Sequence, residues 1–169
     1  MALAPLVEAA TAELADAMQE RGLSVETRTS EVTVSGDPLR LRQVVANLLS
    51  NAAKFVPPGG HVWVELVAES TWARLVVADD GPGIAPEDLP HVFERFFRGK
   101  GTGVGGSGIG LAVVAGLVNA HGGEVAVASE PGHGTTFTVR LPQAAPEAPR
   151  ALAGRAPAVP ATNVAREPS

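Results

Sequence analysis

The stretch Asp79-Asp-Gly-Pro-Gly-Ile84 places a carboxylate directly after an apolar segment and follows it with glycines. Residues 75–78 read as a β-strand, so Asp79 would stand at the end of a strand. A carboxylate in that position can accept a hydrogen bond from an adenine amino group, while the glycines let the backbone approach a ligand closely. Taken alone, the same residues also fit an ordinary Asp-Gly turn.

A polar stripe lies upstream, where residues 47–54 read Asn-Leu-Leu-Ser-Asn-Ala-Ala-Lys. Asp37-Pro38 predicts the start of a helix that runs to about Phe55, because Asp is a favoured N-cap and Pro suits the first helical position. On that helix the asparagines and the lysine share one narrow stripe. An amide oxygen can ligate magnesium and an ammonium can neutralise phosphate, although a solvated polar stripe is the alternative.

Two glycine-rich motifs follow, Gly103-Val-Gly-Gly-Ser-Gly-Ile-Gly-Leu111 and Gly132-His-Gly-Thr-Thr-Phe137. The first opens a helix predicted from about Gly108 to His121, whose free N–H groups and dipole favour phosphate. It is not a dinucleotide fingerprint, which should follow the first strand of the domain. The threonine hydroxyls of the second motif could support the Asp79 contact with adenine, or could simply belong to an edge strand.

Composition narrows the function classes. The chain has 169 residues, the size of one domain, and a formal net charge of -5, which disfavours a broad nucleic-acid surface. Without cysteine it has neither disulfides nor thiolate metal sites. The longest apolar run is too short for a bilayer, and the N-terminus does not read as a signal peptide, so we expect no membrane insertion.

Periodicity predicts one α+β domain over residues 1–142. A helix is expected at residues 3–21 and a short one from Pro86, and strands are expected at residues 23–28, 31–35, 61–69, 72–78, 124–129 and 135–141. Residues 143–169 are rich in Ala, Pro and Arg and read as a disordered tail. The histidines show neither metal-ligand spacing nor a nucleophile pattern, so we expect structural or surface roles for His61, His91, His121 and His133.

In this order, the motifs resemble the catalytic ATP-binding domain of bacterial sensor histidine kinases, in the superfamily shared with gyrase, heat-shock chaperones and mismatch-repair ATPases. The resemblance spans residues 3–142. The matching positions are Asn47, Asn51 and Lys54 in the N box, Asp79, Gly81 and Gly83 in the first glycine box, Phe93, Phe96 and Phe97 in the F box, Gly106, Gly108 and Gly110 in the second glycine box, and Gly132, Gly134 and Thr135 in the third.

The resemblance implies a Bergerat-type fold, a two-layer α/β sandwich whose mixed, mostly antiparallel sheet is covered on one face by three helices. It implies ATP and Mg²⁺ as cofactors. Asp79 would bind the adenine amino group, Asn51 would ligate magnesium, and Asn47 and Lys54 would place the phosphates. Residues 83–108 would form a mobile ATP lid, with Arg98 as a phosphate contact. The remaining nucleotide contacts would be Gly81, Gly83, Ile84, Gly106, Gly108, Gly110, Leu111 and Thr135.

The family transfers the γ-phosphoryl group to a histidine on a separate dimerisation domain and then serves a response regulator. None of the histidines lies in such a context, and the chain begins where that domain would end. The resemblance therefore implies a cytoplasmic catalytic half, from a parent that could be membrane-anchored, with little phosphotransfer activity of its own. It would be either a fragment or a truncated product.

Rival functions belong to the same superfamily. An anti-sigma-factor serine kinase matches less well around Lys54. A gyrase-type hydrolase would need a carboxylate base at position 47 to activate water, and Asn47 is a poor base. A non-catalytic nucleotide sensor is the third alternative, against which the intact boxes argue.

Overall fold

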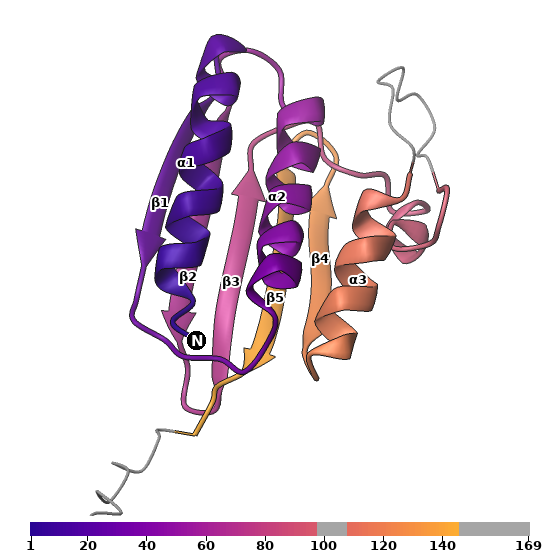
Figure 1. Cartoon of the computed structure of the whole chain (residues 1–169). Helices are drawn as coiled ribbons and strands as arrows, with labels where there is room; N and C mark the ends of the chain where they lie inside the picture. The colour runs from indigo at the N-terminus through magenta and orange to yellow at the C-terminus, as the bar shows by residue number, and fades with distance from the viewer. Residues whose placement is uncertain (98–107, 146–169) are drawn as a thin grey trace, which may run out of the picture.

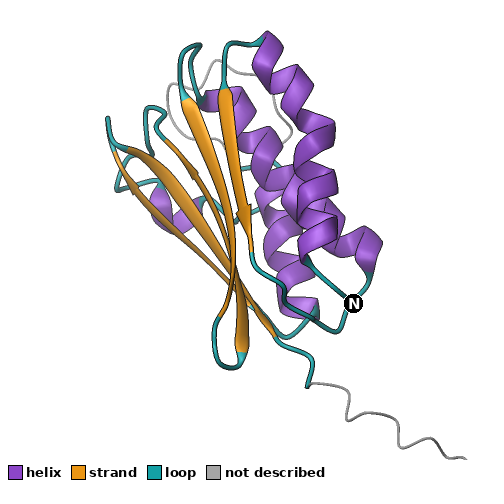
Figure 2. Ribbon diagram, turned by 90° about the vertical axis from the view of Figure 1, so that its left-hand side faces the viewer, coloured by secondary structure: helices purple, strands orange, loops and turns teal. Residues whose placement is uncertain are grey.

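The computed structural model describes residues 1–97 and 108–145, and these residues form two layers (Figures 1 and 2). A five-stranded sheet makes one layer, and three α-helices cover one of its faces. The predicted α+β sandwich is confirmed. The elements are α1 (Ala4–Glu20), β1 (Ser24–Thr29), α2 (Pro38–Phe55), β2 (His61–Ala68), β3 (Trp72–Asp79), the 3-10 turn η1 (Leu89–His91), α3 (Gly110–Ala120), β4 (Glu124–Glu130) and β5 (Gly134–Pro142).

The sheet is mixed and mostly antiparallel, as predicted. Its strand order is β1-β2-β3-β5-β4, in which β1 and β2 run parallel and every other neighbouring pair runs antiparallel. The short turns between β2 and β3 and between β4 and β5 explain why those pairs are antiparallel hairpins. β3 lies at the centre of the sheet, so the residues at its end are supported from both sides.

The core follows from alternation along the strands. Every second residue of β3 is buried, from Ala73 through Leu75 to Val77. The register places Leu75 beside Val139 of β5, and Val77 beside Phe137. Side chains of one face recur at every second position, so these rows form an apolar surface under the helices.

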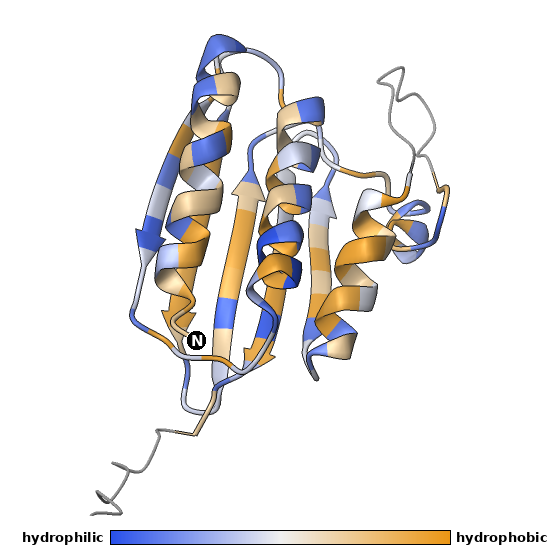
Figure 3. Ribbon diagram, in the orientation of Figure 1, coloured by the Kyte–Doolittle hydropathy of each residue, from blue (hydrophilic) through white to orange (hydrophobic). Residues whose placement is uncertain are grey.

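Helix α2 is the helix whose local sequence explains its boundaries best. The Asp37 side chain caps it by accepting hydrogen bonds from the backbone N–H groups of Leu39 and Arg40, and Pro38 occupies the first turn. Its apolar stripe is buried against the sheet, with Leu48 at 0% exposure. Figure 3 shows that α2 carries both hydrophobic and hydrophilic residues along its length.

The strand predicted at residues 31–35 is wrong in its extent. Only isolated bridges form there, between Thr33 and Ala2 and between Val34 and Gln143. The segment lies between two different partners, one on each side, so no continuous ladder develops. Val32 and Val34 are nevertheless buried, which explains the apolar alternation that suggested a strand.

The short helix predicted from Pro86 is reduced to the 3-10 turn η1. At the other end of the domain, the Gln143 N–H donates to the Thr71 carbonyl and the Ala144 N–H to the Thr33 carbonyl, so both residues are tied to the sheet. Residues 146–169 of the predicted tail lie outside the described residues, and the division of the chain at residue 142 stays a prediction.

Leu48→Ala should lower the free energy of unfolding by about 3–5 kcal/mol, because it leaves a cavity where α2 meets the sheet. Leu39→Ala on the same helix is the matched control, since Leu39 is 74% exposed. That control should change stability by less than about 0.5 kcal/mol. Urea unfolding of the two variants checks the difference, and equal losses would show that α2 does not pack as described.

Candidate functional site

The apolar rows of the sheet end in a polar row. Asp79 continues the buried alternation of β3, and the register pairs it with Thr135 of β5, which in turn neighbours Ser129 of β4. Thr135 is 7% exposed, and its hydroxyl lies 2.9 Å from the Ser129 hydroxyl. This row of Asp79, Thr135 and Ser129 faces the helix side at the edge of the core, and we call it the polar end row.

The Asp79 carboxylate is half-buried and only partly satisfied by the protein. Its Oδ1 accepts a hydrogen bond of 2.9 Å from the Gly81 N–H. Burial raises the pKa of Asp79, while the backbone N–H groups of Gly81 and Thr135 act in the opposite direction. A carboxylate held in this way presents an acceptor to a ligand that carries a donor.

Glycines close the site around Asp79. Gly134 has φ +89°, and a Cβ there would collide with the Asp79 backbone carbonyl. A Cβ on Gly81 would stand 2.9 Å from the Asp79 Oδ1 and 3.3 Å from the Val56 side chain. The first and third glycine boxes are therefore close-packed against the same residue, as their predicted joint role requires.

Sequence reasoning missed the hydrogen bonds of Ser129 and of the Asp80–His61 pair at this edge. The Ser129 hydroxyl accepts a hydrogen bond from the Ile84 N–H at 2.8 Å and donates one to the Gly134 carbonyl. The neighbouring Asp80 accepts hydrogen bonds from His61, at 2.7 Å from the backbone N–H and 3.0 Å from Nδ1. The backbone hydrogen bond from His61 is the main reason that the pKa of Asp80 is lowered.

The adjacent carboxylates therefore differ in environment. Asp80 is exposed and already paired, while Asp79 is half-buried and open to a ligand. The alternation of β3 could have indicated this difference, because Asp79 occupies the core-facing parity and Asp80 does not.

Helices α2 and α3 form the second part of the site. The Asn47 Nδ2 donates to the Gly110 carbonyl at 3.2 Å, which joins the polar stripe of α2 to the start of α3. Within the described residues, the side chains of Asn51 and Lys54 make no hydrogen bond. Among residues 1–97 and 108–145, no side chain caps the first turn of α3, and this turn holds no acidic residue. N–H groups at such a helix start suit an anion.

The F box closes onto the start of α3. The Phe96 N–H donates to the Gly108 carbonyl at 3.0 Å, and Phe96 itself has φ +63°, an unusual value for a bulky residue. A Cβ on Gly108 would stand 2.9 Å from the Phe96 backbone. Phe93 packs edge-on against Phe137 of the core. These contacts hold Phe96 beside Gly108 and Phe93 against the core.

Most of the predicted site residues are thus brought to one end of the sheet and the adjoining ends of the helices. Leu111 packs against the core beneath this end. Arg98 and Gly106 lie outside the described residues.

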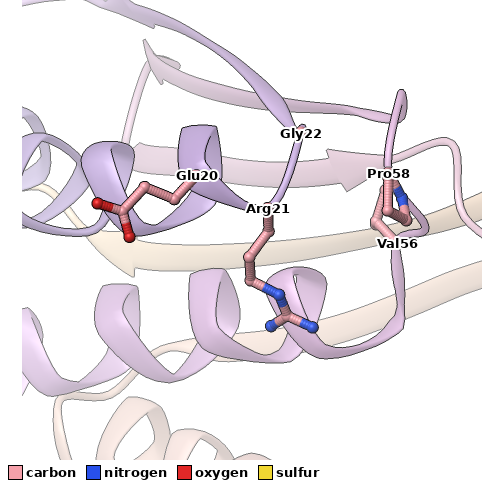
Figure 4. A pocket seen from close by; sticks show the side chains of 5 residues that line it. All are labelled: Glu20, Arg21, Gly22, Val56 and Pro58. Carbon is pink, nitrogen blue, oxygen red and sulfur yellow. The ribbon is translucent and has the colours of Figure 1, made fainter.

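A separate pocket carries none of the predicted site residues (Figure 4). It lies where α1 ends and beyond the end of α2, and it is lined by Glu20, Arg21, Gly22, Val56 and Pro58. Val56 is the residue that it shares with the surroundings of Gly81.

Within residues 1–97 and 108–145, no cluster of three or more His, Asp or Glu side chains could hold a metal by itself. Magnesium often takes only one or two protein ligands and completes its shell with water and substrate phosphates. The amide oxygen of Asn51, a neutral ligand of the kind that magnesium accepts, fits such a site. Over the same residues, no helix combines the length and apolarity that crossing a bilayer demands.

The glycine-lined carboxylate, the amide stripe and the start of α3 therefore lie together on a two-layer α/β sandwich. The sequence model of the histidine kinase-, DNA gyrase B- and HSP90-like ATPases matches residues 36–145, well over half of the chain. The chain therefore belongs to this family.

Relatives and solved structures agree with this membership. The chain is 42% identical over 131 residues to the sensor histidine kinase CusS of Escherichia coli O157:H7, covering 74% of this chain and 26% of that protein. It is 44% identical over 124 residues to the sensor-like histidine kinase SenX3 of Mycobacterium tuberculosis, covering 70% and 30%. The chain thus spans about a quarter to a third of the length of these curated relatives.

Among solved structures, a mycobacterial sensor histidine kinase, MprB, superposes with a TM-score of 0.77 at 35% identity, covering 85% of this chain and 97% of that one. Full-length ShkA in complex with AMPPNP gives a TM-score of 0.74 at 33% identity, covering 84% and 30%. The chain is therefore similar to histidine kinases in sequence and in fold, and the predicted family is confirmed.

Gly134→Ala should unfold the chain or cost at least about 3 kcal/mol, because its Cβ would displace β3 from β5 at a positive φ. Gly116→Ala is the matched control, since nothing lies within 4 Å of a Cβ there and the position is inside α3. That control should gain up to about 1 kcal/mol from helix propensity. Thermal unfolding of both variants measures the contrast.

Asp79→Asn should make the ligand-free chain more stable at neutral pH. The folded-state pKa of Asp79 is raised, so its ionisation costs stability as the pH rises through that pKa. The advantage of the variant should shrink as the solution is acidified. Asp80→Asn is the control with the opposite sign, because the lowered pKa of Asp80 contributes stability at neutral pH that is lost on acidification. Urea unfolding from neutral pH down to below the ordinary carboxyl pKa checks both signs, above that pKa for Asp79 and below it for Asp80.

Proposed function

We propose that this chain binds Mg-ATP and donates its γ-phosphoryl group to a histidine on a separate dimerisation domain. The observation that carries the proposal is the half-buried Asp79 carboxylate, which Gly81 and Gly134 pack against. Its Oδ1 accepts from the Gly81 N–H, and the carboxylate can accept a further hydrogen bond from a ligand. The family membership and the resemblance to an AMPPNP-bound kinase support the choice of nucleotide.

Adenine would be recognised at the polar end row. Asp79 would accept a hydrogen bond from the exocyclic amino group, and the Thr135 hydroxyl would support that contact directly or through water. A guanine base presents a carbonyl oxygen where adenine presents the amino group. Two acceptors would then face each other, so the site should discriminate against GTP.

The phosphates would lie between α2 and α3. The free N–H groups of the first turn of α3, near Gly110, would face them, and Lys54 would neutralise part of their charge. Asn51 would ligate magnesium through its amide oxygen, while Asn47, held by its Nδ2 to Gly110, keeps its own oxygen free. Gly81, Gly83, Ile84, Gly108, Leu111 and Thr135 would complete the nucleotide site.

The chemistry favours a kinase over a hydrolase. Transfer requires the acceptor imidazole nitrogen to attack the γ-phosphorus while the bond to the ADP oxygen breaks. An amide at position 47 cannot remove a proton from water, so hydrolysis would be slow. The partners would be a histidine-bearing dimerisation domain and, downstream, a response regulator. The catalytic domain would occupy residues 1–142 and act in the cytoplasm.

Calorimetric titration tests nucleotide binding. The wild type should bind Mg-ATP with a Kd in the micromolar range and GTP at least about tenfold more weakly, because a lost complementary hydrogen bond leaves polar groups unpaired. Asp79→Asn should weaken Mg-ATP binding by a similar factor. Asp80→Asn should bind as the wild type does, because Asp80 is tied to His61. Equal affinities for Asp79→Asn and the wild type would refute the role of Asp79.

Phosphotransfer is tested by adding a separately purified two-helix domain with its phosphorylatable histidine. With γ-labelled ATP, label should appear on that domain in an acid-labile form, and Asn51→Ala should abolish it. Without the acceptor, phosphate release should stay close to the uncatalysed rate. Rapid release by the wild type, lost in Asn51→Ala, would instead identify a hydrolase.

A further inference from the structure

His121 connects the helices that carry the phosphate end of the site. It follows α3, and its Nε2 accepts a hydrogen bond of 3.1 Å from the backbone N–H of Asp37, the N-cap of α2. Its Nδ1 lies 2.7 Å from the Leu117 carbonyl, to which it donates. The Asp37 N–H can only donate, so this pair of contacts selects the neutral tautomer with the proton on Nδ1.

The space around His121 is closed on the side of α2. A Cβ on Gly36 would stand 2.5 Å from the His121 Cδ2 and 3.1 Å from a methyl group of Leu41. The Cδ2 and Nε2 atoms of the ring therefore lie close against Gly36, the residue before the helix cap. Only glycine at position 36 lets the imidazole reach the Asp37 N–H.

A second bond joins the middle of α2 to the start of α3, from the Asn47 Nδ2 to the Gly110 carbonyl. Asp37 and Asn47 are about 15 Å apart along α2, and Gly110 and His121 are about 16 Å apart along α3, at 1.5 Å per residue. The matched separations mean that the helices run antiparallel, with one bond at each end of α3. Sliding one helix along the other would break both bonds.

We propose that His121 is a positioning residue of the nucleotide site. By holding the cap of α2 against the end of α3, it sets the position of Asn47 and Asn51 relative to the free N–H groups at the start of α3. This inference rests on the proposed nucleotide function. His121 acts on the phosphate end alone, because the adenine end is built on β3, β4 and β5.

The test compares affinities for Mg-ATP and for adenosine, which lacks the phosphates. His121→Phe keeps a ring but loses both nitrogens, and Gly36→Ala displaces the ring while keeping the histidine. Each should raise the Kd for Mg-ATP about fivefold, the effect of one ordinary hydrogen bond. Each should leave the Kd for adenosine within about twofold of the wild type. His121→Gln should restore Mg-ATP binding, because its amide oxygen can accept from the Asp37 N–H.

Thr11→Ala is the control for stability alone. Thr11 is buried in α1, and its hydroxyl donates to the Val7 carbonyl at 2.8 Å. This variant should lower the melting temperature and leave both affinities unchanged. A His121→Phe variant that binds both ligands like the wild type, or loses both equally, would reduce His121 to a structural contact and overturn the proposal.

The hydrogen bonds of His121 with Asp37 and Leu117, which we call the His121 clamp, also have a readout that needs no nucleotide. Nitrogen NMR of the imidazole should find His121 protonated on Nδ1 and hydrogen-bonded at a bare Nε2 near neutral pH. A ring protonated on Nε2 would overturn the clamp itself. Failure of the wild type to bind Mg-ATP would instead overturn the proposed nucleotide function. The NMR measurement of which ring nitrogen is protonated would still test the His121 clamp.

Discussion

The placement of one half-buried carboxylate constrains the rest of the site. Asp79 occupies a core-facing position of the central strand, in the row that follows Val77 and Phe137. A slip of one residue between β3 and β5 would turn the carboxylate to the open face of the sheet. Gly134 suits the observed register, because a side chain at that position would collide with the Asp79 carbonyl. The register of the sheet therefore positions the proposed adenine contact.

That placement has a cost in stability, which the chain offsets locally. Burial disfavours the ionised form of Asp79, and the N–H groups of Gly81 and Thr135 partly compensate. Repulsion from Asp80 also raises the pKa of Asp79, and His61 holds the Asp80 carboxylate by two hydrogen bonds. An acceptor that is only partly satisfied by the protein is a poor feature for folding and a good one for binding, a trade often found at functional sites.

Sequence reasoning succeeded where local chemistry decides the outcome. The Asp37-Pro38 start of α2 follows from capping, and the positions of β2, β3, β4 and β5 follow from periodicity. It failed where the partner is remote in sequence. Residues 31–35 alternate like a strand, yet their neighbours are the chain start and Gln143. Ser129, His61 and His121 gain their partners only once register and helix packing are known. Their spacing along the chain therefore did not predict these hydrogen bonds.

The site divides into two structural halves with different supports. The adenine half is fixed by β3, β4 and β5, which are joined by two continuous ladders. The phosphate half depends on two helices that pack on the sheet and on each other through side chains, with two hydrogen bonds between them. Helix packing tolerates small shifts that a hydrogen-bonded ladder does not. Changes at the ends of α2 and α3 can therefore alter the geometry around the phosphates while the base-binding half stays intact, which gives His121 an influence on the site that it does not touch.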